Sequence, residues 1–236
     1  MRMKIILLFL LFAVAGSNAQ QRPENFLTPA EQAEGWQLLF NGKNFEGWKT
    51  FNGNTSCEGW SIEEGCMVSQ DIHTDHGADI ITVKEFGDFE LSLEWKITPE
   101  GNSGIFYRAR EGKAEAIYEI ASEYQLLDDE GWGSKVTDLQ KTGACYAMYA
   151  PLSGKKLNPV GEFNVSKIVA KDSLVQHWLN GEKIVEYKMW SEDWYQRKAA
   201  GKWKNAPYYG TERRGHIGFQ NHGKKVYIRN VKIKPL

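Results

Sequence analysis

The chain has few cysteines and no long apolar stretch beyond its N-terminal residues. Only three cysteines occur among 236 residues, at spacings that match no zinc site. Neither sign of charge dominates, since 29 basic residues face 30 acidic ones, and nucleic acid or an anionic surface is therefore not indicated as a partner. The sequence contains no internal repeat or low-complexity tract, and nothing in it indicates an oligomeric state. The sequence therefore predicts one packed domain, with no membrane-spanning segment after its N-terminal residues.

The first 19 residues have the three-part layout of a secretory signal peptide. Arg2 and Lys4 form a basic start, an apolar run follows from Ile5 to Val14, and small residues at 17–19 precede a predicted cut ahead of Gln20. A membrane anchor is the alternative, but the run is shorter than the roughly 20 residues that a helix needs to cross a bilayer. We therefore expect an exported protein, periplasmic or secreted.

After a polar linker over 20–33, which holds a predicted helical turn at Pro29 to Ala33, the domain at 34–236 has period-two hydrophobicity almost throughout. Many short strands with regular turns predict an all-β, two-sheet antiparallel jelly-roll sandwich. One short inserted helix is expected between the cap Ser191 and Gly201. Asn180-Gly181 predicts a hairpin, and residues 222–224 are expected to join the last two strands in the same way. The predicted strands are Trp36–Phe40, Trp60–Glu63, Cys66–Ser69, Ile80–Thr82, Phe89–Ile97, Ser103–Ala109, Tyr118–Ile120, Glu123–Leu127, Ala144–Tyr149, Phe163–Ala170, Ser173–Leu179, Lys183–Lys188, Gly215–Asn221 and Val226–Pro235.

The cysteines divide into a close pair and a single residue. Cys57 and Cys66 flank a short predicted strand and its turn, so an oxidising compartment allows a local disulfide between them or two free thiols. Cys145 lies among apolar neighbours, where we expect a buried and unreactive thiol.

An unusual set of polar residues occupies the outward positions of four predicted strands. A merely solvated face would carry mostly Lys, Glu, Thr and Ser, whereas these positions combine carboxylate, amide, guanidinium and imidazole groups. Gly104 and Gly218 on the same face mark places where another group approaches closely. The pattern predicts a polar groove for a sugar, rimmed by aromatic residues such as Trp132, although each residue alone could simply stabilise a turn. The polar positions are Glu94, Lys96, Arg108, Glu123, Gln125, Gln220 and His222.

Six ordered motifs from about Trp36 to Ile233 resemble the 3-keto-disaccharide hydrolase family. They include 36-WQLLFNG-42, 102-NSGIFYR-108, 123-EYQLLD-128, 177-HWLNG-181 and 218-GFQNHG-223. The resemblance implies a concanavalin-like jelly roll, shared with laminarinase-type glucanases, and activity on glycosides oxidised at C3. Retaining glucanases of this fold carry Glu-x-Asp-x-x-Glu on one strand. Here Gln125 stands at the middle position, so the two-carboxylate retaining mechanism is not expected.

A ketone at C3 makes the C2 proton acidic, so the C1 aglycone can leave by elimination, with hydration afterwards. Glu123 is the predicted base, Arg108 the group that stabilises the enolate, and His222 or His177 the acid. Alternatives stay open: Glu123 could pair with Arg108 or Lys96, and His177 faces an apolar side typical of a core histidine.

The remaining expectations concern the ligand. Carbohydrate is the predicted substrate, without a required cofactor. A divalent metal could nevertheless replace Arg108, held by the histidines or by the carboxylates Asp79, Glu94, Glu123 and Asp128. A non-catalytic carbohydrate-binding module and a conventional glycoside hydrolase remain competing interpretations. The predicted sugar-contacting residues are Gln125, Gln220, Glu94, Lys96, His177, Asn180, Asp128 and Trp132.

Overall fold

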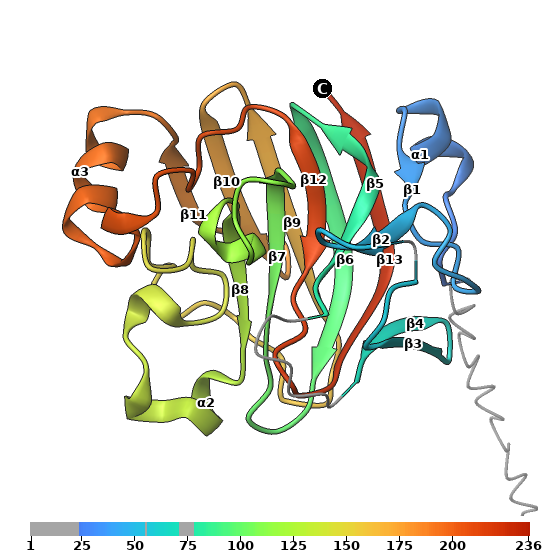
Figure 1. Ribbon diagram of the computed structural model, residues 1–236. Helices are drawn as coiled ribbons and strands as arrows, with labels where there is room; N and C mark the ends of the chain where they lie inside the picture. Colours follow the sequence, from blue (N-terminus) through green and yellow to red (C-terminus); the bar gives the residue numbers. More distant parts are fainter. Residues whose placement is uncertain (1–23, 55, 71–77) are drawn as a thin grey trace, which may run out of the picture.

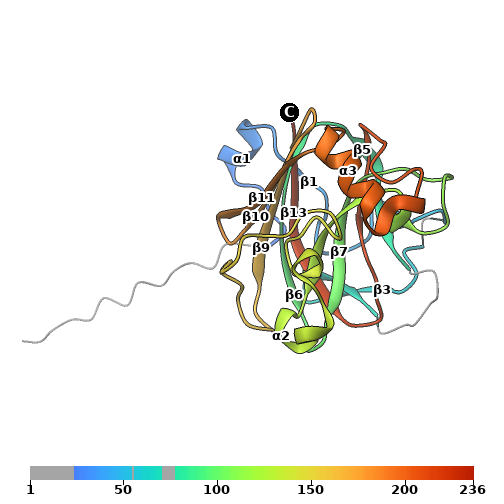
Figure 2. The same cartoon turned by 90° about the vertical axis from the view of Figure 1, so that its left-hand side faces the viewer.

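The computed structural model describes residues 24–54, 56–70 and 78–236, in which two antiparallel sheets pack face to face (Figures 1 and 2). The predicted signal peptide lies outside these residues. The larger sheet has eight strands and the smaller has five, which confirms the all-β jelly-roll prediction. Within the described part of the chain, no helix is long and apolar enough to span a membrane.

The larger sheet runs β11-β10-β9-β6-β13-β4-β3, with β1 also pairing with β13. Its strands are β1 (Gln37–Leu38), β3 (Trp60–Glu63), β4 (Cys66–Ser69), β6 (Phe89–Ile97), β9 (Asn164–Lys171), β10 (Leu174–Leu179), β11 (Glu182–Lys188) and β13 (Val226–Pro235). The smaller sheet runs β2-β5-β12-β7-β8. Its strands are β2 (Trp48–Thr50), β5 (Ile80–Phe86), β7 (Asn102–Ala109), β8 (Ser122–Leu127) and β12 (Gly215–Phe219).

Helical segments are short and lie outside the sandwich, with α2 and α3 on the β8 side of the molecule and α1 on the opposite side (Figure 1). Ser191 caps α3 as predicted, and its hydroxyl accepts from the Trp194 N–H. The turn at Pro29–Ala33 is also confirmed. The helices are α1 (Pro29–Ala33), α2 (Asp129–Trp132) and α3 (Glu192–Ala200), with 3₁₀ turns η1 (Ile117–Glu119), η2 (Gly133–Lys135), η3 (Asp138–Gln140) and η4 (Lys202–Asn205).

The main core fills the space between the sheets, as the period-two pattern predicts. The five apolar residues of β6 are buried and alternate with half-buried polar ones, and Ile105, Tyr124 and Phe219 meet them from the smaller sheet. A second, smaller core lies on the outer face of the smaller sheet, where Phe106 and Ile81 pack beneath Ile117. Burying each large apolar side chain contributes about 1.5–3 kcal/mol.

The two turn predictions had different outcomes. Asn180 and Gly181 both have positive φ and join β10 to β11, so this hairpin is confirmed. The prediction for residues 222–224 is wrong, because β12 and β13 belong to different sheets and the segment crosses between layers. Two predicted strands are also absent: the 3₁₀ turn Ile117–Glu119 replaces one, and the stretch after Ala144 forms only isolated bridges.

The cysteines are all free and buried, so the disulfide between Cys57 and Cys66 is not formed. Cys57 belongs to the core between the sheets. Cys66 faces the other side of the larger sheet, near Arg229 and Glu24, so the sheet separates the two thiols. Cys145 is buried as predicted, and burial raises the pKa of its thiol to about 11, which makes it a poor nucleophile.

Candidate active site

The central feature of the outer face of the smaller sheet is the carboxyl of Glu123. On β8, Tyr124 and Leu126 point into the main core, so Glu123 and Gln125 point to the outer face. Glu123 pairs with Phe106, and Gln125 pairs with Gly104. A Cβ on Gly104 would lie only 2.1 Å from Glu123 Oε1. The glycine is therefore required where the sequence predicted a close approach, and the approaching group is the carboxylate of the neighbouring strand.

A second carboxyl, that of Asp79, lies on the same face. The Gln220 N–H donates to the Gly104 carbonyl at 3.0 Å, and the next residue, Asn221, donates its N–H to Asp79 Oδ1 at 2.9 Å. These bonds place Gln220 between β7 and the start of β5. Gln220 has the same orientation as Gly218, because Ile217 and Phe219 both belong to the main core.

Burial governs the protonation of both carboxyls. Glu123 is 4% exposed and Asp79 is 7% exposed. Desolvation raises the pKa of Glu123 to about 8, although the positive charge of Lys202 opposes the increase and the charge of Asp79 adds to it. Desolvation also raises the pKa of Asp79 to about 7, against the Asn221 hydrogen bond. Both groups thus exchange protons near neutral pH, the range in which a general acid or base works best.

A pocket of about 260 Å³, whose lining includes Trp132 and His222, lies next to the Glu123 site. Asn102 connects the two, because it lines this pocket and its Oδ1 accepts from Gln125 Nε2 at 2.8 Å. Trp132 is half-buried, and its Nε1–H donates to the Glu100 carbonyl at 3.1 Å. A fixed indole face beside an amide and an imidazole is suited to a sugar ring.

Another side of the site is bordered by Trp203, which the sequence predicted at the rim, and by Tyr146 and Lys202, which it did not. The Tyr146 N–H donates to the Glu123 carbonyl at 3.0 Å, and the Trp203 indole donates to the Tyr146 carbonyl at 3.2 Å. The ammonium of Lys202 lies over both rings. Tyr146 lies in a loop, and Lys202 and Trp203 lie in the 3₁₀ turn η4, so no strand alternation predicts where their side chains point.

The prediction that Arg108 faces outward is wrong. Its φ is +56°, and this local departure from strand geometry turns the side chain inward. The guanidinium is 2% exposed. It donates to the Gly87 carbonyl, to the Asp172 carbonyl and to Asp88 Oδ1. Arg108 is thus neutralised away from Glu123, and the salt bridge considered between these two residues is not formed.

Glu94 and Lys96 also lie away from the site. Both are on β6 of the larger sheet, where Glu94 accepts from Arg229 Nε at 2.8 Å and Lys96 stacks over Tyr227. Outward positions of β6 face solvent on the opposite side of the sandwich from Glu123. On β6 the strand pattern identified the outward residues correctly, but it could not assign the strand to a sheet.

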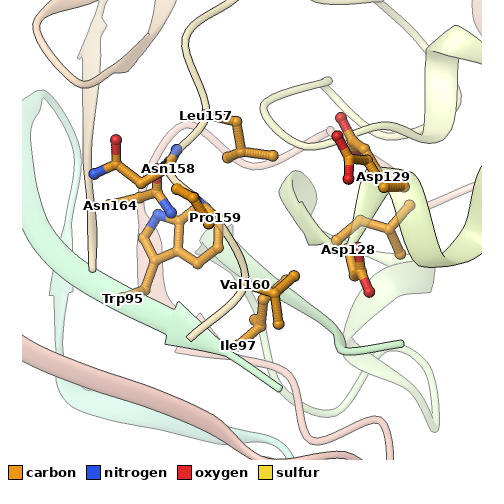
Figure 3. Close-up of a pocket in the computed structure, with 11 residues that line it drawn as sticks. Trp95, Ile97, Asp128, Asp129, Leu157, Asn158, Pro159, Val160 and Asn164 are labelled. Carbon is orange, nitrogen blue, oxygen red and sulfur yellow. Dashed lines mark hydrogen bonds between the residues drawn. The ribbon is translucent and has the colours of Figure 1, made fainter. Parts of the chain in front are cut away.

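Three further predicted residues have structural partners elsewhere. His177 is fully buried between the Tyr107 hydroxyl and the Gly143 carbonyl, which matches the core-histidine alternative. The Asn180 side chain attaches its hairpin to β9, because it accepts from the Val165 N–H and donates to Asn164 Oδ1. Asp128 caps α2 by accepting from the Gly131 N–H at 2.9 Å. It lines a separate cavity of about 420 Å³ at the end of the sandwich (Figure 3).

Fewer of the predicted metal-binding residues lie together than the sequence suggested. Of the carboxylates considered, only Asp79 and Glu123 share a face, while Glu94 and Asp128 lie elsewhere. The described residues contain no cluster of three or more histidine, cysteine, aspartate or glutamate side chains in metal-binding geometry. Two carboxylates can serve as ligands of a hard divalent ion.

The fold and site define a jelly-roll protein with two buried carboxyls on the outer face of its smaller sheet, beside an aromatic pocket. Residues 35–234 match the family of 3-keto-alpha-glucoside-1,2-lyase-like domains, and the chain belongs to this family. It is 31% identical to a 3-keto-disaccharide hydrolase of Bacteroides thetaiotaomicron, over 86% of this chain and 79% of that protein.

Two solved structures from Parabacteroides distasonis, both provisionally assigned as glycosyl hydrolases, are similar to the chain. One is 46% identical with a TM-score of 0.84, covering 91% of this chain and all of that one. The other is 27% identical with a TM-score of 0.65, covering 85% of this chain and 99% of that one.

Proposed function

We propose that this protein cleaves the glycosidic bond of 3-keto-glycosides, including 3-keto-disaccharides, by elimination at C1–C2 followed by hydration. The observation that carries the proposal is the Glu123 carboxyl, held over Gly104 with a pKa near 8. Membership of the family and the name of the Bacteroides relative support the substrate class.

The chemistry begins at C2 of the oxidised sugar. Ionised Glu123 takes the C2 proton, and the electron pair delocalises onto the C3 oxygen as an enolate. The pair then returns to form the C1–C2 double bond and expels the aglycone oxygen, which takes up a proton. Water adds at C1, the Glu123 carboxylic acid returns its proton to C2, and the net reaction is hydrolysis. A base of this kind contributes about 10²- to 10⁴-fold.

Asp79 and His222 are the two candidates for the acid that protonates the aglycone oxygen. Asp79 has a pKa near 7 and is therefore partly protonated at neutral pH. His222 is exposed in the pocket beside Trp132. Gln125 and Gln220 flank the carboxyls on the same face and are suited to hold sugar hydroxyls, and Trp132 offers a stacking surface. Substituting Asp79 or His222 and comparing the pH dependence of kcat distinguishes the two acids.

The decisive experiment compares a 3-keto-glycoside with the same glycoside unoxidised. We expect aglycone release from the oxidised substrate only. Glu123→Gln should reduce turnover at least 100-fold, while Glu94→Gln, on the opposite sheet, should keep it. The base requires its ionised form, so kcat/KM should rise with pH up to about 8. Cleavage of the unoxidised compound would indicate a conventional glycoside hydrolase, and binding without cleavage of either would indicate a carbohydrate-binding module.

We also propose that the protein is exported, on the basis of the basic, apolar and small-residue segments of residues 1–19. N-terminal sequencing of the mature protein from a native periplasmic or extracellular fraction should begin at Gln20. A mature chain that retains Met1 contradicts this.

A further inference from the structure

Lys202 is attached to the Glu123 site through a short chain of fixed contacts. It begins η4, whose next residue, Trp203, is buried and stacks on Tyr209 with ring centroids 4.3 Å apart and an interplanar angle of 9°. The Trp203 indole donates to the Tyr146 carbonyl, and the Tyr146 N–H donates to the Glu123 carbonyl. Two hydrogen bonds and a stacked pair of rings therefore fix the position of η4 relative to β8.

Three aromatic rings surround the Lys202 ammonium. The Nζ atom lies 4.4 Å from the ring centroid of Tyr146, 4.8 Å from that of Trp203 and 5.8 Å from that of Tyr118. Cation–π contacts orient an ammonium group but leave its charge intact. Among the salt bridges formed by the described residues, none involves Lys202. The side chain thus presents, at the edge of the site, an ammonium group that no carboxylate of the described residues neutralises.

The Lys202 charge acts on Glu123. It is the largest influence that lowers the pKa of this carboxyl, against the effect of burial. The ammonium also lies 4.4 Å from the ring centroid of Tyr146, the residue whose N–H binds the Glu123 carbonyl, so the lysine is held beside this position of β8. Arg108 cannot act on this site, because its guanidinium is neutralised by Asp88 and buried on the other side of the sheet.

We propose that Lys202 is the electrophilic catalytic residue of the elimination, donating a hydrogen bond to the C3 oxygen as it becomes an enolate. This inference rests on the proposed function. The ammonium keeps its proton: Glu123 accepts the C2 proton, the electron pair moves to the C3 oxygen beside Lys202, and it then returns to expel the C1 aglycone. Tyr146 and Trp203 hold the ammonium in place and form a wall for the sugar.

Lys202→Met tests the role, with Lys202→Arg to restore the charge and Lys204→Met, a neighbouring exposed lysine, as the matched control. Two rates are measured: aglycone release from a 3-keto-glucoside, and exchange of its C2 proton in D₂O followed by NMR. Loss of one donor to a developing oxyanion typically costs 10²- to 10³-fold in kcat. We expect losses of that size in both rates for Lys202→Met, recovery of at least tenfold for Lys202→Arg, and wild-type rates for Lys204→Met.

The pH dependence separates electrostatic from structural effects. Removing the Lys202 charge should move the rise of kcat/KM to higher pH, because this charge lowers the pKa of Glu123. A variant that is only mispacked keeps the wild-type pH profile. Rates within threefold of wild type for Lys202→Met, or loss through KM alone, overturn the role of Lys202 while the proposed function stands. If the wild-type protein neither exchanges nor cleaves the 3-keto-glucoside, both proposals fail.

Discussion

Glu123→Gln should make the protein more stable while it abolishes turnover. Glutamine has the shape of a protonated glutamic acid and can occupy the same place over Gly104. It carries no ionisable group, so the variant loses the cost of keeping a carboxyl in a desolvated site. Stability and activity are expected to move in opposite directions, as at a site where function requires an unfavourable environment.

The size of the effect follows from the pKa of Glu123, which rises from 4.5 to about 8 on folding. A raised carboxyl pKa means that stability is lost as pH rises through the interval between these values, because the unfolded chain ionises first. At pH 7 the folded protein is destabilised by about 3 kcal/mol, at roughly 1.4 kcal/mol for each pH unit above 4.5. For a domain of this size, that corresponds to about 6–12 °C in Tm.

Thermal unfolding of both proteins between pH 4 and pH 9 checks this reasoning. The two curves of Tm against pH should nearly meet at pH 4, diverge with rising pH, and run parallel above pH 8. Asp79 has a raised pKa in the wild type, so the difference between the proteins is compared, not either curve alone. A Glu123→Gln variant that is equally stable at every pH would show that the carboxyl is well solvated, and the argument from burial would fail.

Other substitutions test separate parts of the site. Gly104→Ala should reduce kcat at least tenfold with little change in Tm, because its Cβ displaces the Glu123 carboxyl; Gly87→Ala, whose Cβ has only ordinary contacts, is the control, and equal kinetics for the two would contradict this reasoning. Trp132→Ala should raise KM about 3- to 10-fold through loss of stacking, which steady-state kinetics would detect; an unchanged KM removes Trp132 from the sugar site. Arg108→Met should lower unfolding stability by about 2–4 kcal/mol in denaturant titrations and leave kcat within a few-fold, whereas a large kcat loss at unchanged stability would return Arg108 to the site.

Most of the fold could be predicted from hydrophobic alternation and turn residues. The apolar face of β6, the Asn180-Gly181 hairpin and the Ser191 cap all follow from local rules of backbone geometry. The predictions were wrong where the chain leaves regular strands and turns. The segment after Phe219 has the turn residues of a hairpin, yet it carries the chain from one sheet to the other, and no local signal distinguishes the two paths.

Only part of the candidate site could be predicted from strand alternation and turn residues. Glu123, Gln125 and Gln220 were placed on one face because side chains alternate along β8 and from Ile217 onward in β12. The prediction for Arg108 was wrong because Arg108 itself has a φ of +56°, which reverses the direction of its side chain. Period-two alternation does not predict such a position. Lys202 was missed because it begins the 3₁₀ turn η4, which reaches the site through long-range contacts.

The sequence by itself determined which residues alternate between core and surface, where the chain turns, and which family the ordered motifs resemble, because all of these depend on neighbours in the chain. Tertiary structure alone decided which outward faces share a sheet. It placed Glu94 and Lys96 on one side of the sandwich and Glu123 with Asp79 and Gln220 on the other. It also created the buried surroundings that raise the carboxyl pKa values, since desolvation depends on everything packed around a group and not on the group itself.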